Sequence, residues 1–252
     1  MRDPDRKKEL LRTLCDARLR RQLPADFPLS ARKAHRAARL LAHRYYNGRM
    51  KRSFQYSRAL SSRTGRQATD VLGGPAFDGF VADCALGSFD SARRLGEMAV
   101  VHLDGAAHPG PWWRDLVQYE FAYFLQTATT QTTIQVMRYR RRAGAWCRLF
   151  SWRLPEVLER LRAGQAVTDD LRHECTLLFC RGEGNRVIVA EVEKDAEAVF
   201  RATNGLRLPA QIAQAAGLDL ESTLQVLEQF VALGAVEPPL PEAGIEEAAR
   251  KA

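Results

Sequence analysis

The sequence predicts an α+β protein in which a helical N-terminal domain is followed by a winged-helix-like C-terminal domain, a β-hairpin plus three helices. Three observations lead to this fold class. Apolar residues recur at helical spacing over about the first 130 residues, the sequence becomes β-branched and alternating from Thr129, and two strand-like runs after His173 precede three helical patterns. We therefore expect a helical domain at 1–128, an extended linking segment with a short helix at 129–170, the winged-helix-like domain at 171–237 and a flexible tail at 238–252.

The helical domain is expected to begin with an amphipathic segment over 5–23, which ends before Pro24. Ser30 can cap a second helix, and Asn47 with Gly48 should end it because both residues tolerate the left-handed conformation of a C-cap. Shorter helical pieces are expected at 54–60, 76–86 and 91–101. The glycine- and proline-rich stretch 105–111 is a loop, and a strongly amphipathic helix follows it from Trp113.

The middle of the chain is expected to be extended at 129–139 and at 146–154, with the basic turn Arg140 to Arg142 between the two segments. Pro155 fits the first turn of a short helix that ends at Gly164.

The C-terminal domain shows the clearest pattern. The runs 175–180 and 186–192 are joined by Gly182-Glu-Gly-Asn, which is typical of a hairpin. One helix should end at Asn204-Gly205, a short helix should span 209–217, and a last helix should run from an N-cap at Asp219 to Gly234.

The formal charge of +8 is unevenly distributed. Residues 1–66 contain 19 Lys and Arg against 5 Asp and Glu, so this end has a net charge of +14 and the rest of the chain must carry −6. Such an asymmetry points to an acidic partner, and a solvated arginine-rich helical surface is an equally good interpretation. The chain has no apolar run long enough to span a membrane and no signal-like N-terminus, so we expect a cytoplasmic protein without membrane contact.

The sequence offers few residues for catalysis. The five cysteines include no Cys-x-x-Cys pair, which favours buried free thiols over disulfides or a zinc site. His173 and Cys175 would share one face of a strand, but Cys180 would lie on the opposite face, so a common metal site is unfavourable. The glycines match neither a dinucleotide fingerprint nor a phosphate loop. We therefore expect no metal or other cofactor in this chain.

Two binding functions remain, and they belong to different classes. A winged helix usually suggests a DNA-binding transcriptional regulator, whose last helix enters the major groove. From Leu208 to Ala249, however, the chain contains no Lys or Arg, and Asp219, Glu221 and Glu228 would bring negative charge to the phosphates. The alternative is capture of an extended peptide that adds a strand to the exposed edge of the hairpin.

The C-terminal segments resemble the PqqD-like recognition element, which holds leader segments of ribosomally made, post-translationally modified peptides. The resemblance rests on the hairpin from Cys175 to Val192, on Phe200-Arg-Ala-Thr-Asn-Gly, and on the helix Leu224-Gln-Val-Leu-Glu-Gln-Phe-Val with the residues after it. The resemblance spans about 65 residues and is a similarity in sequence pattern.

The helix that starts near Pro111-Trp-Trp-Arg-Asp-Leu-Val-Gln-Tyr-Glu-Phe-Ala resembles one in small proteins encoded beside iron-dependent peptide-modifying enzymes. Both halves together are most similar to the partner proteins of methanobactin and 3-thiaglutamate biosynthesis, the MbnC and TglI type. This resemblance implies a non-catalytic subunit that binds a precursor peptide and forms a heterodimer with a TIM-barrel enzyme. It also implies that the multinuclear iron centre lies in that enzyme. For the TglI type, the implied reaction is oxidative removal of the β-carbon of a C-terminal cysteine.

Two sets of residues are expected to form the interfaces. Strand addition would use the edge residues and the helix behind them, which are Arg186, Val187, Ile188, Val189, Ala190, Leu224, Leu227 and Phe230. A core role for these apolar residues is the competing interpretation. The aromatic residues Trp112, Trp113, Tyr119 and Tyr123 exceed what one helix face can bury, so some are expected to contact the enzyme. Arg140 to Arg142 could attract an acidic leader or could simply be solvated.

Overall fold

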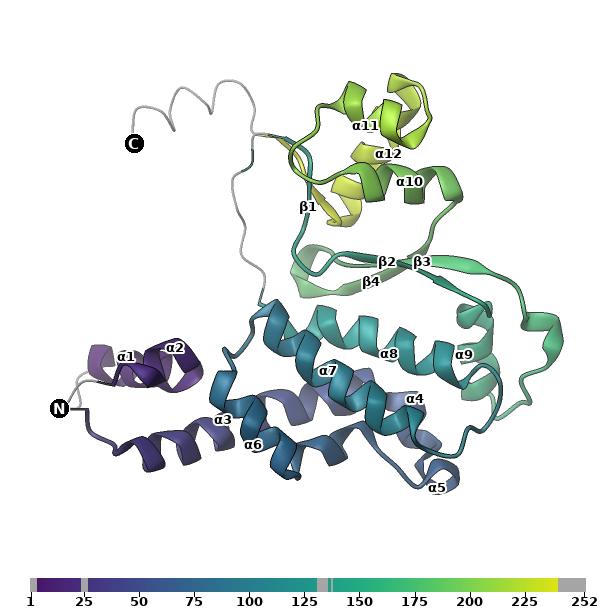
Figure 1. Cartoon of the computed structure of the whole chain (residues 1–252). Helices are drawn as coiled ribbons and strands as arrows, with labels where there is room; N and C mark the ends of the chain where they lie inside the picture. The colour runs from purple at the N-terminus through teal and green to yellow at the C-terminus, as the bar shows by residue number, and fades with distance from the viewer. Residues whose placement is uncertain (1–3, 24–26, 131–135, 137, 240–252) are drawn as a thin grey trace, which may run out of the picture. The chain divides into compact units, whose positions relative to one another are not determined.

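The computed structural model describes residues 4–23, 27–130, 136 and 138–239. It divides the chain into two compact units, unit 1 at 1–130 and unit 2 at 131–252. Helices occur in both units, and the strands of the described residues lie in unit 2, so the expected α+β class is confirmed (Figure 1). None of the helices in the described ranges is long and apolar enough to cross a membrane.

The regular elements among the described residues of unit 1 are all helices. Its elements are α1 (Pro4–Cys15), α2 (Ala17–Arg21), α3 (Ala31–Ser53), α4 (Gln55–Ala59), α5 (Ser61–Thr64), η1 (Ala68–Leu72), α6 (Pro75–Asp83), α7 (Phe89–Asp104) and α8 (Trp113–Ala128).

Aromatic side chains form the centre of unit 1. Tyr46 of α3 packs edge-on against Phe80 of α6 and also contacts Phe124 of α8, and all three are buried. The adjoining rings of Phe54 and Phe77 are equally buried. Aromatic residues bury large apolar areas, so these contacts between three helices stabilise the unit.

Two expected helix boundaries in unit 1 are wrong. The first segment is broken at Asp16, whose carboxylate caps α2 by accepting a hydrogen bond of 2.8 Å from the Arg18 N–H. In contrast, α3 continues through Asn47 and Gly48 to Ser53. The residues after Gly48 include buried Met50, so the tertiary packing of the next turns outweighs the local preference for a C-cap.

Unit 2 combines a small sheet with helices. Its elements are β1 (Arg140–Arg141), β2 (Trp146–Phe150), α9 (Leu154–Arg162), η2 (Asp169–Leu171), β3 (Cys175–Arg181), η3 (Glu183–Asn185), β4 (Val187–Glu191), α10 (Lys194–Ala202), α11 (Pro209–Ala216), α12 (Leu220–Leu233) and β5 (Val236–Glu237).

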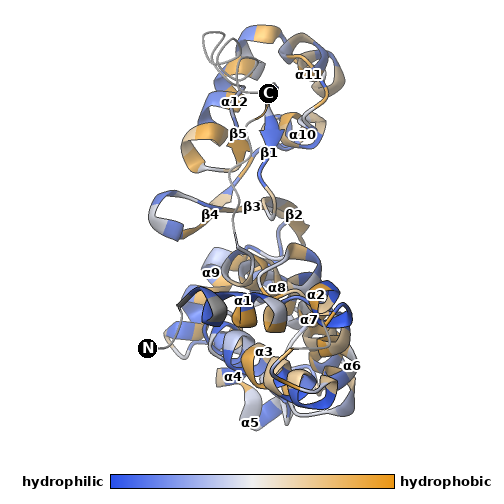
Figure 2. Cartoon of the chain, turned by 90° about the vertical axis from the view of Figure 1, so that its left-hand side faces the viewer, coloured by the Kyte–Doolittle hydropathy of each residue, from blue (hydrophilic) through white to orange (hydrophobic). Residues whose placement is uncertain are grey.

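The main sheet is antiparallel and has the order β2-β3-β4, so β3 is central. Helices α10, α11 and α12 pack on the face of β3 that carries Leu178 and Cys180. The helices show both orange and blue residues in Figure 2, as expected for elements with one buried and one exposed side.

The segment 129–170 differs from the expected link. Its residues 146–150 form β2 and pair with β3, so they belong to the same sheet as the hairpin. Arg140 and Arg141 do not lie in a turn but form β1, which pairs with β5, and the turn follows at Arg142–Ala145. The first expected extended segment, 129–139, lies largely outside the described residues.

Candidate functional site

The β3–β4 hairpin closes through a tight turn with two left-handed residues. Gly184 has φ 65° and Asn185 has φ 61°, which are the residue types that adopt this conformation most readily. The N–H of Gly182 donates to the carbonyl of Arg186 at 2.9 Å and closes the base of the turn. The turn therefore fixes the register of β4.

That register determines which backbone groups of β4 point away from β3. The Gly182–Arg186 bond and the 2.9 Å bond from the Val192 N–H to the Thr176 carbonyl mark two hydrogen-bonded pairs of the ladder. Because such pairs alternate in an antiparallel ladder, Ile188 and Ala190 also bond toward β3. The N–H and C=O groups of Val187, Val189 and Glu191 therefore point outward from the sheet edge.

The outer edge of β4 has no strand partner within the described part of the chain. A second edge exists at β2, and the same alternation places the outward backbone groups there at Cys147 and Leu149. An edge strand with unpaired groups is a template for strand addition. The sheet thus offers two edges, and only β4 joins directly to the helical layer through α10.

The side chains of β4 alternate between the two faces of the sheet. Ile188 lies opposite Cys180 and packs against the core that α10, α11 and α12 form. Val187 and Val189 point to the other face, opposite Arg181 and Phe179, and are half-buried. The expected edge residues therefore lie on both faces of the sheet. Arg186 is exposed beside the turn.

The structure changes the expected role of the last helix. Leu227 is completely buried and Phe230 is 3% exposed, where it packs edge-on against Phe200. Neither side chain is open to a ligand, because both are needed to fill the small core. Leu220 is 47% exposed and Leu224 is half-buried, whereas the other half-buried apolar residues Val226, Val231 and Leu233 of α12 pack against the core.

The other end of α12 is fixed against the hairpin. Gly234 ends the helix with φ 78°, and a Cβ atom at this position would lie 2.6 Å from the Arg181 carbonyl oxygen. The Cys180 thiol also donates to the Leu233 carbonyl at 3.3 Å. The close approach requires glycine, so it holds the C-terminus of α12 beside the end of β3.

We expect Gly234→Ala to lower the free energy of unfolding by about 3 kcal/mol, because it adds a steric clash with backbone to the strain of a left-handed residue. Gly217→Ala is the matched control, since Gly217 also caps a helix with φ 73° but a Cβ there meets nothing within 4 Å. Urea denaturation of both variants measures the difference. Equal losses of unfolding free energy in the two variants would show that the close approach of α12 to β3 does not contribute to stability.

The aromatic residues expected at the enzyme interface are mostly inside the protein. Trp113 is fully buried and Trp112 is 6% exposed, so these two tryptophans are not available to a partner. The expectation failed because it considered one helix face, whereas α8 is buried around most of its circumference. Tyr119 and Tyr123 are half-buried, and their contact with an enzyme stays a prediction.

No set of three or more His, Cys, Asp or Glu side chains among the described residues could hold a metal ion. Burial raises the pKa of the Cys147 thiol to about 12 and that of Cys180 to about 11, so both are unreactive near neutral pH. A cavity of about 750 Å³ in unit 1 has mainly apolar walls that include Val71, Met98 and Val101. The same cavity is also lined by Asp70 and His102, whose Oδ2 and Nε2 atoms lie 3.1 Å apart.

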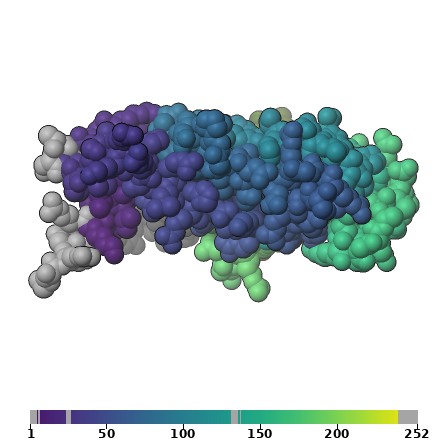
Figure 3. Space-filling model, turned by 90° about the horizontal axis from the view of Figure 1, so that it is seen from below, coloured from purple at the N-terminus to yellow at the C-terminus, as the bar shows by residue number. Residues whose placement is uncertain are grey.

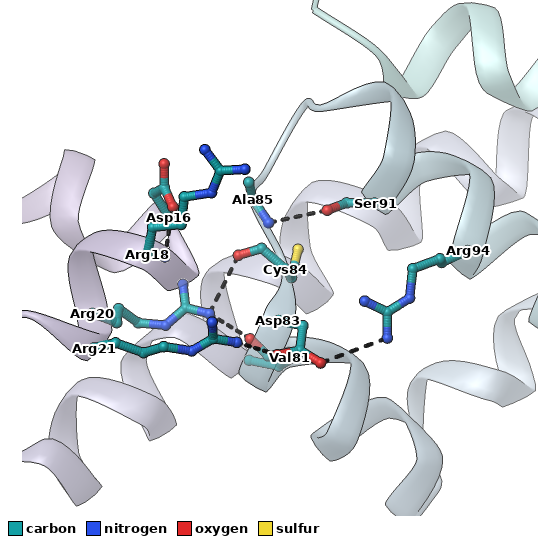
Figure 4. Close-up of polar contacts among 10 residues, drawn as sticks. All are labelled: Asp16, Arg18, Arg20, Arg21, Val81, Asp83, Cys84, Ala85, Ser91 and Arg94. Carbon is teal, nitrogen blue, oxygen red and sulfur yellow. Dashed lines mark hydrogen bonds and ion pairs between the residues drawn. The ribbon is translucent and has the colours of Figure 1, made fainter.

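The polar cluster in Figure 4 joins α2 to the end of α6. The guanidinium of Arg20 donates to the Leu14 carbonyl at 2.7 Å, to the Cys84 carbonyl at 3.3 Å and also to the Val81 carbonyl. Beside it, Arg21 forms an ion pair with Asp83. Leu14 belongs to the last turn of α1, and Val81 and Cys84 lie at the end of α6, so Arg20 joins the ends of two helices and has a structural role.

We expect Arg20→Ala to lower the free energy of unfolding by about 2 kcal/mol, because the carbonyls that it serves lose a charged donor. Arg18→Ala is the control, since its side chain is exposed on the same helix and should change stability by less than about 0.5 kcal/mol. Thermal denaturation compares the two variants. A loss that is no larger for Arg20→Ala than for Arg18→Ala would contradict the structural role.

No family model matches the chain. No curated protein has significant sequence similarity to it.

Sequence reasoning missed two residues of the candidate site. Glu191 has outward backbone groups, but the sequence left it outside the expected edge because its register was unknown. Leu220 is an exposed apolar residue next to the Asp219 N-cap, and the sequence analysis did not include it in the expected interface. The alternation of the hairpin could have found Glu191 if the turn length had been known.

Proposed function

We propose that this chain is a non-catalytic partner subunit that binds the leader of a ribosomally synthesised precursor peptide along the outer edge of β4. The observation that carries the proposal is the row of outward backbone groups at Val187, Val189 and Glu191, which have no strand partner among the described residues. A peptide that adds as a further strand would satisfy these groups with main-chain hydrogen bonds.

Apolar side chains of unit 2 would provide selectivity. Val187 and Val189 offer half-buried apolar contacts on one face of the sheet. In α12, Leu220 is exposed and Leu224 is half-buried, and in this proposal they are further apolar contacts for the peptide. A leader with apolar residues at alternate positions would place them on one face of the added strand.

The charges of unit 2 support a peptide over DNA. Helices α11 and α12 contain no Lys or Arg, whereas α12 carries Glu221 and Glu228, both exposed. Binding of a winged helix to DNA draws its affinity from contacts between basic residues and phosphates. A transcriptional regulator is therefore the alternative that these charges disfavour.

The resemblance to partner proteins of the MbnC and TglI type extends the proposal to a second partner. In this proposal the chain presents its bound peptide to a TIM-barrel oxidase with a multinuclear iron centre, and unit 1 docks on that enzyme. The modified residue would be a cysteine, and the reaction would be removal of its β-carbon when it is the C-terminal residue. The iron would belong to the enzyme and not to this chain.

A binding titration tests the proposal. A fluorescein-labelled leader peptide with apolar residues at alternate positions is titrated with the full chain, and a duplex DNA of random sequence is titrated in parallel at several salt concentrations. We expect saturable binding of the peptide and weak binding of DNA. DNA binding with a steep salt dependence, without peptide binding, would replace the proposal with the regulator function.

A further inference from the structure

Helix α3 carries a basic face whose charges are not paired by any described residue of unit 1. Residues 27–69 contain eleven Lys and Arg but no Asp or Glu. The buried residues of α3 follow each other at intervals of four, from Ala34 through Ala38 and Ala42 to Tyr46. The opposite side of the helix is exposed, and we call it the basic face: Lys33, Arg36, Leu40, Arg44 and Lys51.

The positive charges of the basic face have no ion-pair partner in the part of the chain that the structure describes. Among the described residues, no carboxylate forms an ion pair with Lys33, Arg36, Arg44 or Lys51. By contrast Arg39, which lies to the side of this face, pairs with Asp78 of α6. The violet-to-blue atoms of this part of the chain are open to view in Figure 3.

The basic face also has an apolar centre. Leu40 is 60% exposed and lies one helical turn from Arg36 on one side and from Arg44 on the other. Protein interfaces commonly place an apolar contact at the centre and charged residues around it. The accessible leucine between two arginines follows this arrangement.

We infer that the basic face of α3 binds an acidic protein surface that carries an apolar side chain opposite Leu40. Carboxylates would pair with Arg36 and Arg44, whose guanidinium groups can donate two parallel hydrogen bonds to one carboxylate. A cluster of such pairs around a buried apolar contact gives orientation and a fast association rate. The inference goes beyond the proposed function, which does not say through which surface or charges unit 1 contacts a partner.

Two features favour an acidic protein over a nucleic acid. Single-stranded nucleic acids bind through aromatic side chains on which bases stack, and no exposed large hydrophobic residue in the described part of α3, α4 and α5 is aromatic. Phosphates of a duplex would pair with the arginines, but they offer no apolar group for Leu40. An anionic membrane surface would likewise attract the charges, and a single leucine would add little insertion energy.

A synthetic helical peptide serves as the probe, because the partner protein is not identified. It carries glutamates at i and i+4 spacing around one central leucine and a fluorescein label, and its anisotropy is measured with the full chain at low salt. We expect Arg36→Glu with Arg44→Glu to weaken binding at least about tenfold. The control pair, Arg172→Glu with Lys194→Glu, changes the net charge equally at exposed positions of unit 2 and should stay within about twofold.

Leu40 provides the second measurement. Leu40→Ser should weaken binding of the leucine peptide about fivefold but should not affect a peptide in which glutamine replaces that leucine. Duplex DNA of similar charge and vesicles with anionic lipid are titrated in parallel. The inference is overturned if both charge-reversal pairs have equal effects, if Leu40→Ser has none, or if DNA or vesicles bind more tightly than the peptide. These outcomes are independent of the precursor-peptide titration, which measures binding at the β4 edge of unit 2.

Discussion

Replacing Val189 by proline is expected to weaken binding of the precursor peptide by at least about thirtyfold while the protein stays folded. The Val189 N–H points outward from β4, so proline at this position removes a donor for the added strand but no bond to β3. Loss of a backbone hydrogen bond and the steric effect of the ring together account for a loss of about 2 kcal/mol or more.

Three variants control this experiment. Val189→Thr keeps the N–H and the β-branched shape, so it should bind almost as the wild type does. Ile188→Pro should unfold unit 2, because the Ile188 N–H bonds toward β3. Leu149→Pro removes an outward donor from the β2 edge and should leave binding unchanged. If Leu149→Pro abolished binding and Val189→Pro did not, the peptide would pair with β2 instead.

The second large effect concerns Glu120, which is completely buried in unit 1. Its Oε1 atom accepts hydrogen bonds from the backbone N–H groups of Tyr56 at 2.6 Å and Ser57 at 3.2 Å. It therefore joins α8 to the first turn of α4. Burial raises the pKa of the Glu120 carboxyl from 4.5 to about 8, and the hydrogen bonds only partly oppose this rise.

A raised carboxyl pKa means that the folded protein keeps a proton that the unfolded chain releases. The contribution of Glu120 to stability is therefore largest below about pH 4.5 and falls as the pH rises to about 8. The loss amounts to about 1.4 kcal/mol per pH unit inside this window. Glu120→Gln keeps an acceptor for both N–H groups and cannot ionise, so it should remove this part of the pH dependence.

Urea denaturation of the wild type and of Glu120→Gln between pH 5 and pH 8 measures the effect. The difference in unfolding free energy should change with pH in favour of the glutamine variant. Glu120→Ala leaves two buried N–H groups without an acceptor and creates a cavity, so it should lose about 3 kcal/mol relative to the glutamine variant at every pH. Parallel curves for the wild type and Glu120→Gln would show that Glu120 is ionised in the folded protein.

Local signals predicted the helices of unit 2 because their ends depend on few residues. Asp219 accepts a hydrogen bond of 2.8 Å from the Ser222 N–H, as an N-cap does, and Gly234 adopts the left-handed conformation expected after a helix. The turn Gly182 to Asn185 likewise predicted the hairpin, which the structure confirms. In each case the stabilising contacts lie within four residues of sequence.

The parts that sequence reasoning missed depend on distant contacts. Pairing of β2 with β3 joins Trp146 to Phe179, and no local pattern specifies that pairing. Similarly, burial of Trp112 and Trp113 depends on packing around the whole of α8 and not on one helical face. The outward-pointing N–H and C=O groups of β4 can be identified only from the hydrogen-bond register of the hairpin. A shift of that register by one residue would exchange the inward- and outward-pointing groups.

Amide hydrogen exchange of the full chain, measured by NMR with and without the precursor peptide, tests strand addition to β4 most directly. The peptide should protect the N–H groups of Val187, Val189 and Glu191, whereas those of Ile188 and Ala190, which already bond to β3, should change little. Protection of Cys147 and Leu149 instead, or of no strand residue at all, would contradict binding at the β4 edge.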